Sequence, residues 1–231
     1  MRSSSSMKHA LILCSGGIDS VTTAYFAQKK KYASHTLMFC AYGQLQEAHE
    51  RRAVKYHARK LKANYVEIAL PALAHLSHKQ RTSPKIHQKK MKDTKHEGKQ
   101  WFVPARNTLL IVHALAYIES HYQGQDKVDL FLGFKNEGRE PFPDATRDYT
   151  KKMQALIRQA STHKVTLKTP LITKDKEDII KKGTKLALNY ATTWSCYQPR
   201  QNKHCGLCLA CRLRKAGFKW ANVADPTSYA Q

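Results

Sequence analysis

Four cysteines in the last part of the chain have the spacing of a metal site. Thiolates arranged as C-x8-C-x2-C-x2-C can close a tetrahedron around one zinc ion, and here they are Cys196, Cys205, Cys208 and Cys211. Because four protein ligands leave no coordination position open, we expect a structural zinc ion. An iron–sulfur cluster also suits four thiolates, and the C-x2-C pairs could support dithiol redox chemistry, so both are alternatives.

A phosphate-binding pattern lies near the start of the chain. The run Ser15-Gly16-Gly17-Ile18-Asp19-Ser20 follows an apolar stretch that ends at Leu13, and it opens a segment with helical spacing of apolar residues. Backbone N–H groups at the start of a helix bind anions, and glycines let phosphates approach closely. We therefore expect Leu13 and these six residues to surround phosphates. The alternative is an ordinary turn with a capped helix.

Asp19 is unusual in an anion site because its carboxylate repels phosphates. A magnesium ion between the carboxylate and the phosphates would remove that repulsion. The loop therefore predicts a nucleotide bound together with a metal ion.

Around these motifs the chain alternates apolar runs with amphipathic segments. This alternation predicts a Rossmann-like α/β fold with about five parallel strands flanked by helices. The expected strands lie at 9–13, 36–42, 65–70, 129–132 and 165–167, and the expected helices at 18–31, 44–61, 108–117 and 149–160. We expect an α/β domain at 8–190 and a zinc-binding segment at 191–231 packed on it. The polar stretch at 76–100 is expected to be a mobile basic insertion whose irregularly spaced histidines bind no metal.

The charge of the chain is strongly basic, with a formal net charge of +23 over 231 residues. Such a field attracts polyanions, but no RNA-binding motif accompanies it, so a nucleic-acid partner is permitted and not predicted. No run of 18 apolar residues and no signal-peptide pattern occurs, which favours a cytoplasmic protein without a membrane span.

Taken together, the motifs resemble a known family. The loop is similar to the pyrophosphate loop of ATP pyrophosphatases such as GMP synthetase. From 8 to 220 the chain resembles the 7-cyano-7-deazaguanine synthase family, through the loop and through Tyr42-Gly43-Gln44, Val103-Pro104-Ala105-Arg106-Asn107, Phe142-Pro143-Asp144, Thr169-Pro170-Leu171-Ile172-x-x-x-Lys176, Trp194-Ser195-Cys196-Tyr197, the cysteine cluster and Arg214-Lys215-x-Gly217-Phe218. The chain departs from the family's usual sequence at Leu45-Gln46, at 137–140 and at Ala145-Thr146.

The resemblance implies an adenine nucleotide alpha hydrolase-like fold and an ATP-dependent ligase of queuosine biosynthesis. ATP with magnesium would adenylate 7-carboxy-7-deazaguanine, ammonia would give an amide, and a second activation would give the nitrile. It further implies a homodimer. Asp19, Arg106 and Lys176 are the expected catalytic residues, and Tyr42, Gln44 and Asn107 are expected to join the loop in binding the nucleotide.

Two other functions remain open at this stage. A related adenylating enzyme could stop at the amide, transfer it, or modify a tRNA base. A thiolating enzyme of that kind would need a reactive cysteine, and both candidates, Cys14 and Cys40, lie in apolar runs where burial is expected. A non-enzymatic zinc-knuckle protein that binds RNA is the alternative from a different class.

Overall fold

A parallel β-sheet forms the centre of the molecule. The computed structural model describes residues 6–76, 101–135 and 142–230. The sheet has five strands in the order β3-β2-β1-β4-β5, and every pairing is parallel. The strands are β1 (Lys8–Leu13), β2 (Ser34–Ala41), β3 (Asn64–Ala69), β4 (Lys127–Phe131) and β5 (Lys164–Lys168). The predicted α/β class and its five parallel strands are confirmed.

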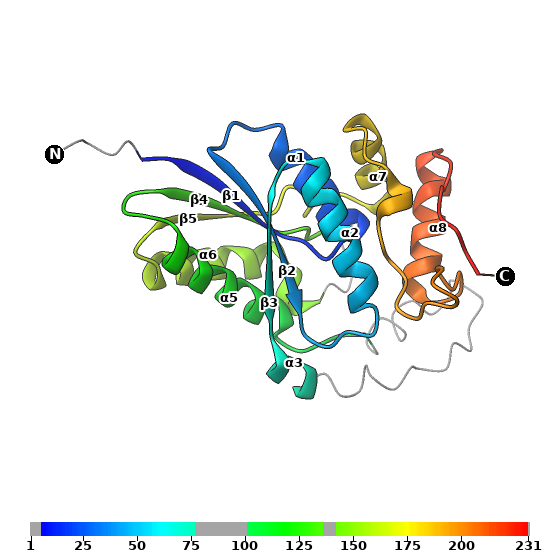
Figure 1. Ribbon diagram of the computed structural model, residues 1–231, viewed down its shortest axis with the longest axis horizontal. Helices are drawn as coiled ribbons and strands as arrows, with labels where there is room; N and C mark the ends of the chain where they lie inside the picture. The colour runs from blue at the N-terminus through cyan, green and yellow to red at the C-terminus, as the bar shows by residue number, and fades with distance from the viewer. Residues whose placement is uncertain (1–5, 77–100, 136–141, 231) are drawn as a thin grey trace.

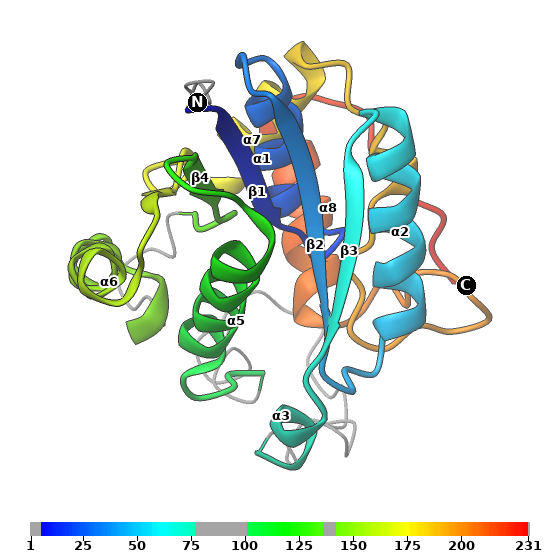
Figure 2. The same cartoon turned by 60° about the vertical axis from the view of Figure 1, so that its left-hand side comes forward.

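Helices cover both faces of the sheet (Figures 1 and 2). One face carries α1 (Ile18–Gln28), α2 (Glu47–Lys60), α7 (Lys176–Lys185) and, outside α7, α8 (Leu209–Ala221). The other face carries α5 (Arg106–His121) and α6 (Arg147–Ala160), while the short α3 (Pro71–Leu76) follows β3. Two apolar cores result, one on each face, and both draw on alternate residues of β1 and β2. None of the described helices is long and apolar enough to cross a membrane.

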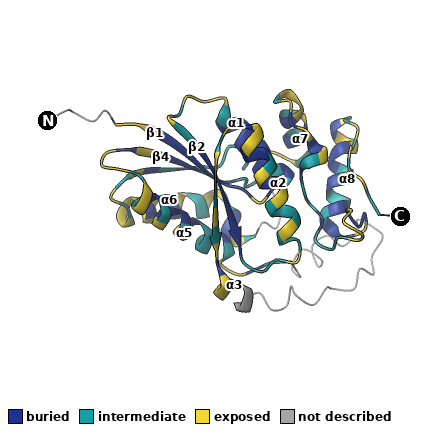
Figure 3. Cartoon of the chain, viewed as in Figure 1, coloured by how far each residue is buried: buried dark blue, intermediate teal, exposed yellow. Residues whose placement is uncertain are grey.

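The burial pattern follows from the position of each strand (Figure 3). Five of the six residues of β1 are buried because the strand has neighbours on both edges and helices on both faces. In β3, which pairs on one edge with β2, all six residues are exposed or only partly buried. β1 therefore gives a site at its carboxyl end a well-packed base.

The strand order places a switch point between β1 and β4. From β1 the chain moves outward through β2 and β3, and it then returns to place β4 on the other edge of β1. The helices that follow β1 and β4, α1 and α6, lie on opposite faces of the sheet, and in open α/β sheets such a divergence at the carboxyl ends of the strands is where a ligand-binding crevice forms. Open α/β sheets bind their ligands at this place.

The helices differ from the sequence-based expectation mainly near the C-terminus. The amphipathic pattern predicted α1, α2, α5 and α6, although α5 begins at Arg106 and runs to His121, beyond the expected range 108–117. It did not predict α7 or α8, which are rich in lysine and arginine. Most of the predicted insertion at 76–100, with His78, His87 and His96, lies outside the described residues, as does the 137–140 departure.

Candidate active site at the carboxyl ends of the strands

The predicted phosphate loop joins β1 to α1 at the crevice. Gly16 has a φ of +76°, and a Cβ there would lie 2.8 Å from the Cβ of Ala53 and 2.9 Å from the carbonyl oxygen of Glu50. A side chain would therefore force the loop away from α2. Gly17 is the N-cap of α1 and makes no side-chain capping bond, so the positive end of the helix dipole faces the crevice without a capping side chain.

Ser20 stabilises the loop from inside, whereas Ser15 is exposed. The backbone N–H of Ser15 donates to the Ser20 hydroxyl at 3.2 Å, and that hydroxyl donates to the carbonyl of Gly17 at 3.2 Å. Leu13 and Ile18 are buried on either side of the loop. The sequence run thus divides into residues that shape the loop and residues that face outward.

Gly133, directly after β4 and Leu132, packs against the backbone of this loop. A Cβ on Gly133 would lie 2.8 Å from the backbone nitrogen of Ser20, 2.9 Å from its Cα and 3.0 Å from the carbonyl carbon of Asp19. The close approach of the two connections at the switch point therefore requires a glycine.

Asp19 and Lys176 form an ion pair, and both are among the three residues expected to be catalytic. The Nζ of Lys176 lies 2.6 and 2.7 Å from the two carboxylate oxygens of Asp19. Lys176 begins α7, and the Cβ of any side chain at Gly217 on α8 would collide with the Cγ of Lys176. The pair gives the Asp19 carboxylate a positive partner beside the phosphate loop.

The connection after β2 forms a second wall of the crevice. The side-chain oxygen of Gln44 accepts a hydrogen bond from the backbone N–H of Tyr42 at 2.9 Å, and its amide nitrogen donates to Glu50 at 2.9 Å. Gln46 donates to the other oxygen of Glu50 at 3.1 Å. These contacts hold Glu50 beside the loop, a position that the sequence pattern does not reveal.

Arg106 and Asn107 open α5 on the opposite side. The guanidinium of Arg106 interacts electrostatically with Tyr42, Asp144 and Tyr197, and its Nη2 donates to the Oδ1 of Asn107 at 3.1 Å. Asn107 is buried, and its amide nitrogen donates to the carbonyl of Asp144 at 3.0 Å. The side chain of Asn107 is thus engaged within the protein, and we interpret it as a support for Arg106.

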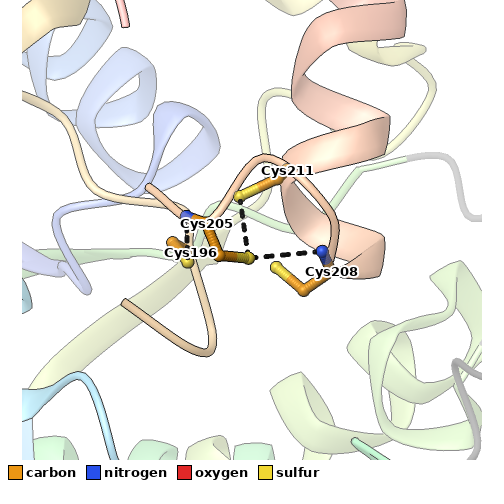
Figure 4. A group of neighbouring side chains, drawn as sticks. All are labelled: Cys196, Cys205, Cys208 and Cys211. Carbon is orange, nitrogen blue, oxygen red and sulfur yellow. Dashed lines mark hydrogen bonds between the residues drawn. The ribbon is translucent and has the colours of Figure 1, made fainter. Parts of the chain in front are cut away.

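The four cysteines come together at the start of α8, as Figure 4 shows. Their sulfur atoms all lie within 4.8 Å of one another, and all four residues are buried. Backbone N–H groups of Cys205 and Cys208 donate to the sulfur atoms of Cys196 and Cys205 at 3.2 and 3.3 Å. Such donors stabilise thiolates, so this cluster could bind a metal ion.

Trp194 connects the cysteine cluster to the phosphate loop. Its backbone N–H donates to the carbonyl of Gly16 at 2.8 Å, and its indole N–H donates to the carbonyl of Cys196 at 2.9 Å. The indole also stacks on the ring of His49 with centroids 4.0 Å apart and an interplanar angle of 9°. In the sequence, Trp194 is recognisable only as part of the Trp194-Ser195-Cys196-Tyr197 motif.

The two remaining cysteines are buried, as expected. Burial raises the pKa of the Cys14 thiol to about 11 and that of Cys40 to about 12. Thiols with these pKa values stay protonated at neutral pH and are poor nucleophiles. The geometry therefore does not favour the thiolating alternative.

Comparison with known proteins gives a match over nearly the whole chain. The family described as queuosine biosynthesis protein QueC matches residues 9–222. A 7-cyano-7-deazaguanine synthase of Rickettsia felis is 34% identical over 231 residues, covering 96% of this chain and 100% of the relative. Synthases of the same name from Vesicomyosocius okutanii and Hydrogenovibrio crunogenus are each 35% identical, covering 95% and 97% of this chain and 95% and 97% of their own lengths.

Proposed function

The chain belongs to the QueC family of queuosine biosynthesis proteins, and from this premise we propose that it is a 7-cyano-7-deazaguanine synthase. The reaction joins 7-carboxy-7-deazaguanine and ammonia at the expense of ATP, through an adenylate and an amide, to form the nitrile. The observation that carries this proposal is the phosphate loop at the switch point of the sheet, in a chain that matches named synthases along almost their entire length.

The loop and α1 supply the binding site for the nucleotide in this proposal. The backbone N–H groups at the start of α1 bind phosphate oxygens, and Ser15 adds an exposed hydroxyl. Lys176 neutralises Asp19, so that the carboxylate does not repel the nucleotide, and Leu13, Gly16, Gly17, Ile18 and Ser20 shape the loop. Magnesium would add positive charge to the phosphates when bound.

Arg106 is suited to the carboxylate or the phosphates of the reacting adenylate. It lies at the start of α5 beside the crevice, where Asn107 accepts a hydrogen bond from its guanidinium and Asp144 attracts it electrostatically. A fixed guanidinium stabilises the negative charge that develops as the carboxylate attacks ATP, and it needs no reorganisation at that moment. Tyr42 and Gln44 belong to the wall formed by the connection after β2, and Tyr42 interacts with this guanidinium.

The cysteine cluster fits a structural zinc ion. Four buried sulfur atoms within 4.8 Å of one another provide all the ligands of a tetrahedral site, so the ion would hold the C-terminal segment together and would take no part in the reaction. We also propose a homodimer in the cytoplasm. Light scattering of the purified protein tests the dimer.

The activity test combines the purified, zinc-loaded protein with ATP, magnesium, ammonium and 7-carboxy-7-deazaguanine, and mass spectrometry follows the products. The nitrile together with AMP and pyrophosphate is the expected result. An amide as the end product would instead support the related adenylating enzyme. No AMP with any deazaguanine substrate would contradict the proposal and leave the RNA-binding alternative.

A further inference from the structure

Glu50 borders the residues of the proposed active site. It belongs to the first half of α2, and its carbonyl oxygen lies against Gly16 of the phosphate loop. Its carboxylate interacts electrostatically with Arg106 of α5 and with Tyr42, which follows β2. Glu50 therefore lies next to the phosphate loop through its backbone, and its carboxylate lies near Arg106 and Tyr42.

Two glutamine amides fix the direction of this carboxylate. Gln44 donates to Oε2 at 2.9 Å and Gln46 donates to Oε1 at 3.1 Å. Gln44 is itself anchored to the end of β2, because its amide nitrogen also donates to the carbonyl of Cys40 at 3.1 Å. Each carboxylate oxygen can accept more than one hydrogen bond, so both retain a lone pair for a further donor.

The surroundings make Glu50 a stronger base than an ordinary carboxylate. Burial is the largest cause and raises its pKa, as does nearby Glu47, while the bonds from Gln44 and Gln46 and the charge of Arg106 lower it; the resulting pKa is about 7. Cys14 and Tyr42 also face Glu50, and both stay neutral near pH 7 because burial raises their pKa. A general base works best when its pKa lies near the operating pH.

We propose that Glu50 binds ammonium and acts as the general base of the amide-forming step, an inference that rests on the proposed synthase function. Ammonium transfers one proton to the Glu50 carboxylate, and the lone pair released on nitrogen attacks the carbonyl carbon of the adenylate. The new C–N bond forms as the C–O bond to the phosphate breaks. AMP leaves with the bonding electrons, and the surplus proton on nitrogen goes to solvent.

Kinetic measurements can separate this role from two simpler ones. If the carboxylate only anchors Gln44, its loss would lower the reaction rate equally for every nucleophile. If the carboxylate recognises the edge of the deazaguanine ring, its loss would lower the affinity for that substrate before any nucleophile binds. A general base for ammonium affects only the rate of the amide-forming step that follows adenylation. It affects that rate only for a nucleophile that must first lose a proton.

Glu50→Gln tests the proposal because it preserves the shape of the side chain and removes the base. We expect pyrophosphate exchange, which reports adenylation without ammonium, to stay within about threefold of the unmodified protein. Amide formation from ammonium should fall on the order of 10²- to 10⁴-fold, the usual contribution of a general base. Hydroxylamine is largely unprotonated at neutral pH, so hydroxamate formation should fall much less.

The other outcomes overturn the proposal. Equal losses with ammonium and hydroxylamine would make Glu50 a structural anchor, and a raised KM for the deazaguanine carboxylate with unchanged kcat would make it a substrate-binding residue. An unchanged rate with ammonium would also refute it. Glu67→Gln is the matched control, because it removes a carboxylate that contacts Arg51 of α2 outside the crevice. Absence of AMP with the unmodified protein would instead contradict the proposed function itself.

Discussion

Gly133→Ala should weaken both ATP binding and the fold. The added Cβ would meet the backbone of Asp19 and Ser20 at 2.8 to 3.0 Å, whereas ordinary contact begins near 3.4 Å. Because these neighbours are backbone atoms at the start of a helix, the loop must move by about half an ångström. A displacement of 1 Å in an active site can lower the reaction rate about 100-fold. On the same scale, we expect a displacement of about half that size to lower ATP affinity about tenfold. Overpacking should lower the free energy of unfolding by about 1–3 kcal/mol.

Gly124→Ala is the matched control for this prediction. Gly124 has a φ of +52°, and no atom lies within 4 Å of the position that a Cβ would take there, so alanine costs about 1 kcal/mol of backbone strain without contact with the site. Titration calorimetry with ATP and urea unfolding should be measured for both variants. Equal ATP affinity in the two variants would refute the argument that Gly133 positions the phosphate loop.

Three further predictions concern other parts of the site. In Lys176→Met the new side chain is one atom shorter than lysine and uncharged, so it leaves Asp19 uncompensated beside the phosphates, and the KM for ATP should rise about tenfold or more. An unchanged KM would remove Lys176 from the site. Cys208→Ser should lower bound zinc, measured by elemental analysis, and the unfolding temperature together; full zinc content would contradict the four-ligand assignment. Cys40→Ala should retain nitrile formation within about twofold, since a buried thiol with a pKa of about 12 performs no chemistry, and loss of turnover in a folded variant would reopen the thiolation hypothesis.

The sheet and the phosphate loop could be predicted because their signals are local. Apolar runs such as 9–13 and the Gly16-Gly17 pair reveal a strand and a turn without knowledge of the rest of the chain. The cysteine cluster was predictable for a related reason, since metal ligands impose their spacing on the sequence. These local patterns account for the fold class and for much of the candidate site.

Glu50 and Gly133 could not be assigned from the sequence because their importance comes from tertiary packing. Glu50 lies in a charged helix between Glu47 and Arg51, where one carboxylate resembles another until the neighbours are known. From the sequence, Gly133 looks like the end of a strand. Only the pairing of β1 with β4 shows that it packs against the phosphate loop. α7 and α8 were missed because their lysine and arginine side chains obscure the short apolar faces that pack together.

The placement of β1 in the middle of the sheet has a consequence for how the protein is made. As the chain leaves the ribosome, β1 can pair with β2 early, but its other edge stays unpaired until β4, which begins at Lys127, has emerged. Trp194, which bonds to Gly16, is synthesised later still. Such long-range pairing slows folding and leaves an apolar strand edge exposed for a time. Truncated chains that end before β4 should therefore be prone to aggregation and depend on chaperones.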